Sequence, residues 1–299
     1  MRIFLLFIIF CLPAYSAKKI KIITTTTNLA DLAKQIGGNQ IEVESLCKGV
    51  QDPHYLEAKP SYTFKLSKAD LLISIGAGLE QGWLPLVVRG SRNPKIREGQ
   101  SARLVASDAV ELLEKHDTHI SRSQGDVHPE GNPHFMLSPQ KSIEVAKKIK
   151  SKISEIAPSQ KSYFEKRLQT YSSRLMKGIS RWEKMIKKGQ RVISYHKTLT
   201  YFYHDFHVQN VNVLEPKPGI PPAASHILKV ISQVKEQGVK KIIVENYFDD
   251  AVARKIKRSV PDVSIEVVPT AVQGQKGIND LFSLYDYLAQ KIGEEKSKS

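Results

Sequence analysis

One long amphipathic segment near the middle of the chain constrains the fold more than any other feature. Between Pro158 and Gly189, apolar residues recur at steps of three and four: Phe164, Leu168, Tyr171, Leu175, Ile179, Trp182 and Ile186. This spacing predicts one helix of roughly 30 residues, about 45 Å long. A coiled coil would need strict heptads and a partner helix, which the sequence does not indicate. We therefore expect a rigid connector between two domains.

Strand and helix patterns alternate on both sides of this segment. Strands are predicted at 19–24, 41–46, 71–75, 191–194, 211–214, 241–244 and 264–268. Helices are predicted at 29–36, 61–68, 223–237, 250–258 and 281–292, the first capped by Thr27 and Asn28. The predicted fold class is α/β: two lobes with parallel sheets flanked by helices, joined by one long rigid helix.

The first residues have the layout of a secretory signal peptide. A positive start precedes the apolar run 3–12, and small residues stand at 14 and 16 before the expected cleavage site. Bulky Phe10 before Cys11 argues against a lipid anchor. We therefore expect a cleavable leader over 1–16, export to the periplasm, an N-terminal α/β lobe over 17–157 with a histidine-containing loop, a connecting helix over 158–189 and a C-terminal α/β lobe over 190–299. Cys47 then remains alone, so we expect it to be buried without a disulfide.

The net charge of +15 would suit nucleic acid or anionic lipid. The lysines, however, are spread along the chain in pairs such as Lys147-Lys148 and Lys240-Lys241, with no basic box interleaved with aromatic residues. Export also separates the protein from nucleic acid. We predict a solvated basic surface and no nucleic-acid partner.

Three histidines stand in predicted loops at strand ends. His54 and His134 each follow a proline, and His196 directly follows the strand 191–194. Such loops converge at the cleft of an open α/β sheet. Three imidazoles there would form a zinc site, since Zn²⁺ prefers nitrogen and sulfur donors. Any one of them alone would more often be a capping or surface residue, so the prediction depends on the set.

A second group of histidines, His116, His119 and His128, lies among acidic residues in a stretch with glycine, serine and proline. That composition predicts a mobile loop, and imidazole with carboxylate favours transition metals. We expect an auxiliary metal-capture loop; a merely polar loop is the alternative.

Catalytic motifs are weak, and we expect no enzyme. Ser194-Tyr195-His196 is not a nucleophile elbow, and the chain has no H-E-x-x-H helix. Gly76-Ala77-Gly78 lacks the further glycine and the lysine of a phosphate loop.

The motifs around the three histidines resemble those of the zinc- and manganese-binding solute-binding proteins of ABC importers, called cluster A-I or family 9. Residues 52–55 (DPHY) with 59–61 (KPS) resemble the first-ligand motif, 132–139 (NPHFMLSP) the second, and 195–197 (YHK) with Tyr201-Phe202 the third. Glu215-Pro216 and 222–228 match another typical segment. The resemblance covers nearly the whole mature chain.

This resemblance implies zinc as cargo, captured outside the cytoplasm and delivered by a monomer to the ABC importer permease in the inner membrane. Manganese is less expected, because carboxylate-rich oxygen sites suit it better. Rival interpretations are an exported zinc-dependent hydrolase, whose metal is also held by three histidines, a binder of an organic ligand such as a siderophore, and a manganese-binding or surface-adhesin variant of the fold.

The sequence departs from the family pattern at several points. Met136 and Ser138 replace the usual Trp and Asp of the second motif, and Lys197 replaces an Asp after the third histidine. Many members take a fourth ligand from an Asp-Pro after the last strand, but 267–272 carries no carboxylate. Glu245 is the expected substitute; it could instead orient His196, and a loop histidine or water could fill the fourth position.

Overall fold

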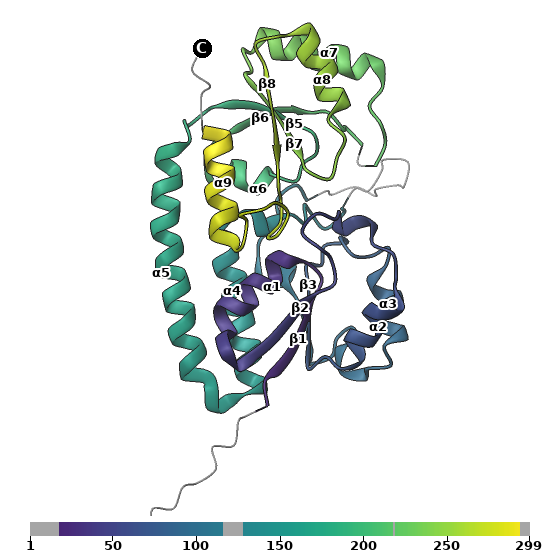
Figure 1. Cartoon of the computed structure of the whole chain (residues 1–299), viewed down its shortest axis with the longest axis vertical. Helices are drawn as coiled ribbons and strands as arrows, with labels where there is room; N and C mark the ends of the chain where they lie inside the picture. The colour runs from purple at the N-terminus through teal and green to yellow at the C-terminus, as the bar shows by residue number, and fades with distance from the viewer. Residues whose placement is uncertain (1–17, 116–127, 218, 294–299) are drawn as a thin grey trace, which may run out of the picture.

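Two parallel four-stranded sheets form the framework of the computed structural model, which describes residues 18–115, 128–217 and 219–293 (Figure 1). The first sheet has the order β2-β1-β3-β4 and the second β6-β5-β7-β8. Their strands are β1 (Ile20–Thr24), β2 (Ile41–Ser45), β3 (Leu71–Ser74), β4 (Arg103–Val105), β5 (Arg191–Ser194), β6 (Gln209–Val213), β7 (Lys241–Glu245) and β8 (Ser264–Val268). The predicted fold class is confirmed.

Helices cover the sheets of both lobes. The first lobe carries α1 (Thr27–Gly37), α2 (Pro60–Ser67) and α3 (Leu84–Gly90), and the second carries α6 (Thr200–Asp205), α7 (Ala224–Glu236) and α8 (Ala251–Ser259). α4 (Pro139–Ile156) packs against α1 and leads toward the connector. No helix among the described residues is long and apolar enough to cross a membrane. The predicted signal peptide, 1–16, lies outside them.

The connector is α5 (Lys161–Met185), a helix of 25 residues that runs beside both lobes (Figure 1). Every apolar position predicted for its inner face is buried, from Phe164 to Ile186. α9 (Leu281–Gly293) packs beside it, and one apolar core joins α1, α4, α5 and α9. Gly178 permits the close packing of the Trp182 ring, because a Cβ there would lie 2.7 Å from a ring carbon.

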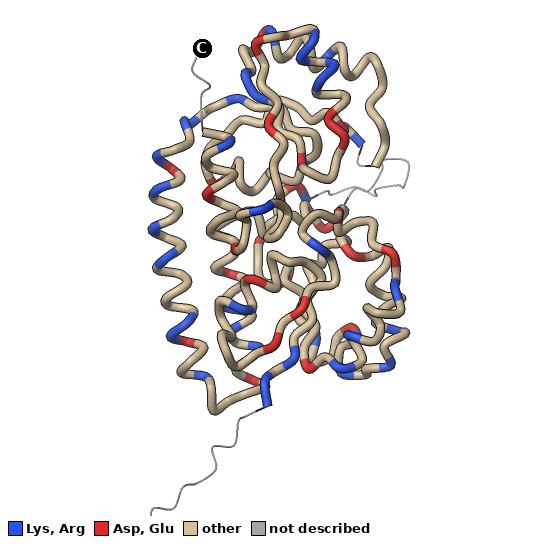
Figure 2. The backbone as a smooth tube through the Cα atoms, in the orientation of Figure 1, with Lys and Arg blue, Asp and Glu red and all other residues tan. Residues whose placement is uncertain are grey.

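The charged side chains are distributed over both lobes, with many lysines and arginines along the outer face of α5 (Figure 2). Several of them form ion pairs with neighbouring acids, such as Lys150 with Glu165 and Lys65 with Glu44. Ion pairs of this partly exposed kind contribute little stability each, typically below about 1 kcal/mol.

Several elements differ from the sequence-based expectation. α1 starts at Thr27, and its cap is Thr26, whose hydroxyl accepts from the Leu29 N–H, rather than Thr27 or Asn28. α4 is absent from the helices predicted above, although Ser138 caps it by accepting from the Lys141 N–H. Serine and aspartate are both good N-caps, which explains why serine is tolerated at this motif position. β4, α3 and α6 are too short to give a clear periodicity.

Two polar side chains of α1 bind the backbone of the C-terminal segment. Asn28 donates to the Thr270 carbonyl at 3.0 Å and accepts from the Val272 N–H at 2.8 Å. Asp31 accepts from the Leu281 N–H at 2.9 Å. Burial, opposed by this hydrogen bond, raises the pKa of Asp31 to about 6. The contact between the two lobes therefore contains a carboxylate that burial destabilises.

We predict that Asp31→Asn stabilises the protein at neutral pH. A carboxyl whose pKa is higher in the folded than in the unfolded chain destabilises the folded state as the pH rises from the lower pKa to the higher one. With an unfolded pKa near 3.9, the gain should be about 3 kcal/mol at pH 7 and below about 1 kcal/mol at pH 4.5. Urea unfolding at both pH values measures it. Asp31→Ala serves as the control. It removes the acceptor for the Leu281 N–H and should lose the contribution of that hydrogen bond at both pH values. An equal gain from Asp31→Asn at both pH values would contradict the raised pKa of Asp31.

Candidate metal centre

Three histidines from distant parts of the chain converge between the two sheets. Each of His54, His134 and His196 offers a ligand nitrogen, and these nitrogens all lie within 4.8 Å of one another. The ring centroids are 5.2 Å apart for His54 and His134, 5.7 Å for His134 and His196, and 6.1 Å for His54 and His196. In the described part of the chain, no carboxylate or thiol belongs to this group. The donors at this point are therefore imidazoles.

The two x-Pro-His motifs position their histidines in the same way. His54 lies in the 3-10 turn Pro53–Tyr55, and Asp52 accepts its backbone N–H at 2.9 Å. His134 precedes the 3-10 turn Phe135–Leu137, and Asn132 accepts its backbone N–H, also at 2.9 Å. In each motif the side chain two residues before the histidine thus closes a local turn. The proline between them has no N–H that would need an acceptor. The motif spacing is a consequence of this turn.

Two carboxylates orient two of the imidazoles. Asp52 lies 2.6 Å from Nδ1 of His54, and Glu215 lies 3.0 Å from Nδ1 of His196. A carboxylate accepts only from a protonated nitrogen, so in each ring Nε2 keeps the lone pair that a metal requires. Burial opposes the charge on Asp52, but the hydrogen bond from His54 prevails and lowers the pKa of this carboxyl.

Glu215 is the site residue whose role the sequence analysis missed. By sequence, Glu215 only matches a family segment, and Glu245 is the residue that could orient His196. Glu215 is buried, and its second oxygen accepts from the Gly219 N–H at 3.0 Å. The available signal in the sequence is an acid directly after the predicted strand 211–214, followed by proline and glycine.

Lys197, the departure from the third motif, forms a contact between the lobes. Its ammonium lies 2.9 Å from Glu114, and Glu114 also accepts from the Asn132 side chain at 2.9 Å. Asn132 in addition donates to the Lys197 carbonyl at 3.0 Å. The turn that holds His134 is therefore linked to the residue after His196 by three polar contacts.

The ring nitrogen Nε2 of His134 is buried. It has no hydrogen-bond partner among the described residues. Burial lowers the pKa of His134 well below its ordinary value, so the ring is neutral at neutral pH. A buried polar atom left without a partner costs about 1–3 kcal/mol. A bound cation would satisfy it.

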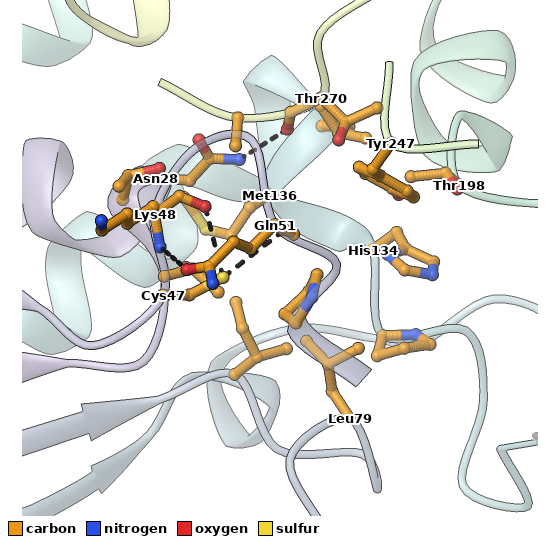
Figure 3. Close-up of a pocket in the computed structure, with 17 residues that line it drawn as sticks. Asn28, Cys47, Lys48, Gln51, Leu79, His134, Met136, Thr198, Tyr247 and Thr270 are labelled. Atoms are coloured by element: carbon orange, nitrogen blue, oxygen red, sulfur yellow. Dashed lines mark hydrogen bonds between the residues drawn. The ribbon is translucent and has the colours of Figure 1, made fainter. Parts of the chain in front are cut away.

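A small cavity lies behind His134 and is lined from both lobes (Figure 3). Asn28 and Cys47 line it on one side and Thr198 and Tyr247 on the other, with a volume of about 50 Å³. Pockets for organic ligands measure roughly 300–1,000 Å³. The site therefore suits an ion with a few waters better than a siderophore. Cys47 is buried and free, as expected.

The remaining predicted site residues lie elsewhere. Glu245, at the end of β7, is fully buried outside the three-nitrogen group. The Thr198 hydroxyl and the His196 N–H face its carboxyl without a hydrogen bond of good geometry, and burial raises its pKa to about 8. His128 lies with Nε2 3.1 Å from Nε2 of His54. The other two histidines of the predicted capture loop, His116 and His119, lie outside the described residues.

Comparison with known proteins places these observations in a family. The family described as "ZnuA: Zinc-uptake complex component A periplasmic" matches residues 22–295. The manganese ABC transporter substrate-binding lipoprotein PsaA of Streptococcus pneumoniae is 25% identical over 296 residues, covering 95% of this chain and 91% of the relative. The metal ABC transporter substrate-binding lipoprotein ScbA of Streptococcus cristatus is 24% identical over 292 residues, covering 94% and 90%.

Solved structures agree with this match at the level of the fold. A crystal structure of ZnuA superposes with a TM-score of 0.77 at 21% identity, covering 92% of this chain and 98% of the other. The substrate-binding protein FpvC of Pseudomonas aeruginosa, in complex with Mn²⁺, gives 0.76 at 21% identity, covering 92% and 97%. The relatives are substrate-binding proteins rather than enzymes, and their names include both zinc and manganese.

The Glu215 contact generates a prediction for metal affinity. In Glu215→Gln, only one side-chain oxygen remains to accept from both the Gly219 N–H and Nδ1 of His196. The imidazole can then adopt the other tautomer, in which the proton is on Nε2. Loss of such a partner typically costs 10–100-fold in metal affinity, and we expect a loss of that size for zinc by chelator competition. Glu245→Gln is the matched control, since it changes a buried acid outside the nitrogen group, and it should alter affinity only a few-fold. Equal losses in both variants would contradict the specific role of Glu215.

Proposed function

The chain belongs to the ZnuA family of periplasmic zinc-uptake components, and from this premise we propose that it captures zinc outside the cytoplasm and delivers it to the permease of an ABC importer. The observation that carries the proposal is the convergence of His54, His134 and His196 on one point with no carboxylate among the described ligand groups. The protein acts by binding and release, without a reaction.

The donor set favours zinc over manganese. Zinc is held well by imidazole in tetrahedral geometry, whereas manganese prefers carboxylate, carbonyl and water oxygens. Relatives named for manganese share the fold, so the metal must be inferred from this chain's own side chains. Two of its imidazoles are oriented by carboxylates, and the third is neutral and buried.

The position of the ligands between the lobes provides a route to release. His54 and His134 precede α5 in the chain, and His196 follows β5 in the second sheet. A permease that moved the lobes apart would separate His196 from the other two ligands and weaken binding. We propose export to the periplasm and action as a monomer, with zinc as cargo rather than cofactor.

We predict that the mature protein binds one zinc ion tightly and that each of the single variants His54→Ala, His134→Ala and His196→Ala weakens binding at least tenfold. Each variant removes one of the three imidazoles that define the site. Isothermal titration with a competing chelator measures the constants. His226→Ala is the control, because His226 bonds the Val213 carbonyl away from the site. Wild-type zinc affinity in all three variants, or tighter binding of manganese than zinc by the parent, would refute the proposed function.

Zinc affinity should also fall in mild acid. A ligand imidazole must be neutral, and histidine takes up a proton near pH 6.5, so protons compete with the metal below about pH 6. We expect at least a tenfold loss of apparent affinity between pH 7.5 and 5.5, measured by chelator competition with the chelator's own pH dependence subtracted. Constant affinity over this range would argue against imidazole ligands.

A further inference from the structure

The contact between His54 and His128 is not explained by a site of three histidines. Their Nε2 atoms lie 3.1 Å apart, and the ring centroids 5.2 Å apart. Asp52 accepts from Nδ1 of His54, so Nε2 of that ring carries a lone pair. His128 thus presents a nitrogen to a ligand atom of the site.

The separation of these two nitrogens is close to that of neighbouring ligands on one zinc ion. Zn–N bonds of about 2.0–2.1 Å in a tetrahedron place two nitrogens about 3.3–3.4 Å apart. The observed 3.1 Å is near this edge length. Without a metal, one ring would have to donate a proton to the other. With a metal, both lone pairs face the ion.

His128 lies beside Gly78 and close to two of the three histidines. A Cβ built at Gly78 would stand 3.3 Å from Nδ1 of His128. His128 approaches from the His54 side, and its centroid is 6.5 Å from that of His134. His128 lies outside the group of three mutually close nitrogens, so ligation by all four histidines requires its ring to move toward His134.

Glu245 fits the fourth position less well. Its carboxyl faces the backbone N–H of His196 rather than a ligand nitrogen. Like His128, Glu245 lies outside the group of mutually close donors. His128, in contrast, touches a ligand atom directly.

We propose that His128 supplies the fourth metal ligand and thereby sets the preference for zinc over manganese. The inference rests on the proposed function and deepens it, because it assigns selectivity to one residue. A fourth imidazole completes an all-nitrogen tetrahedron that zinc accepts and manganese disfavours. Where water or a carboxylate takes this position, the difference between the two metals should shrink.

The test compares His128→Ala and His128→Asp with the parent and with His204→Ala, a control at an exposed histidine on α6. Zinc and manganese affinities are measured by competition, and zinc-edge X-ray absorption counts the imidazole ligands. We expect four imidazoles in the parent and three in both His128 variants, with zinc affinity at least tenfold lower in the alanine variant. The aspartate variant should narrow the zinc-to-manganese affinity ratio at least tenfold. Melting temperatures of the metal-free proteins verify that each variant is folded.

The outcomes separate this inference from the proposed function. Three imidazoles in the parent, or unchanged zinc affinity in His128→Ala while His54→Ala loses it, would overturn the role of His128 and leave zinc capture intact. A large loss in Glu245→Gln with no loss in His128→Ala would transfer the fourth position to Glu245. Retention of zinc by His54→Ala would instead refute the site itself.

Discussion

The burial of one face of α5 is the interaction on which the rest of the structure depends. Its apolar residues enter a core shared with α1, α4 and α9, so the two sheets are held at a fixed separation. At roughly 25 cal/mol per Å² of apolar surface, a face of large side chains such as Phe164 and Trp182 contributes several kcal/mol. The metal centre depends on this separation, because two of its histidines, His54 and His134, precede α5 in the sequence and His196 follows it.

Polar contacts, in addition to apolar burial, set the relative position of the two lobes. Asn28 and Asp31 tie α1 to the C-terminal segment, and Asn132, Glu114 and Lys197 tie the two ligand turns together. Each is directional, so it selects one relative position of the lobes where burial alone would permit several. Asp31 shows that such a contact can carry an electrostatic cost and still be retained.

Metal selectivity in this family cannot be inferred from fold, since relatives named for zinc and for manganese share it. The decisive properties are the atoms that face the ion and the groups that orient them. Here two imidazoles have carboxylate partners, a third is kept neutral by burial, and a fourth lies against the first. This nitrogen-rich environment is the physical basis of our proposal that the site prefers zinc.

The sequence by itself determined most of the strands, the connecting helix with its buried face, and the three histidines that gather at one point. These depend on local periodicity and on turn chemistry within a few residues, as in the x-Pro-His turns. It did not lead us to α4, although Val145, Ile149 and Ile153 recur at helical spacing and this local signal was therefore present. Nor did it reveal which acid serves which imidazole: Glu215 is 19 residues from His196, and His128 is 74 residues from His54. Such pairs have no local signal, because they form only when each lobe folds. The pairing of β5 with β6 brings Glu215 beside His196, and the fold of the first lobe brings His128 to His54.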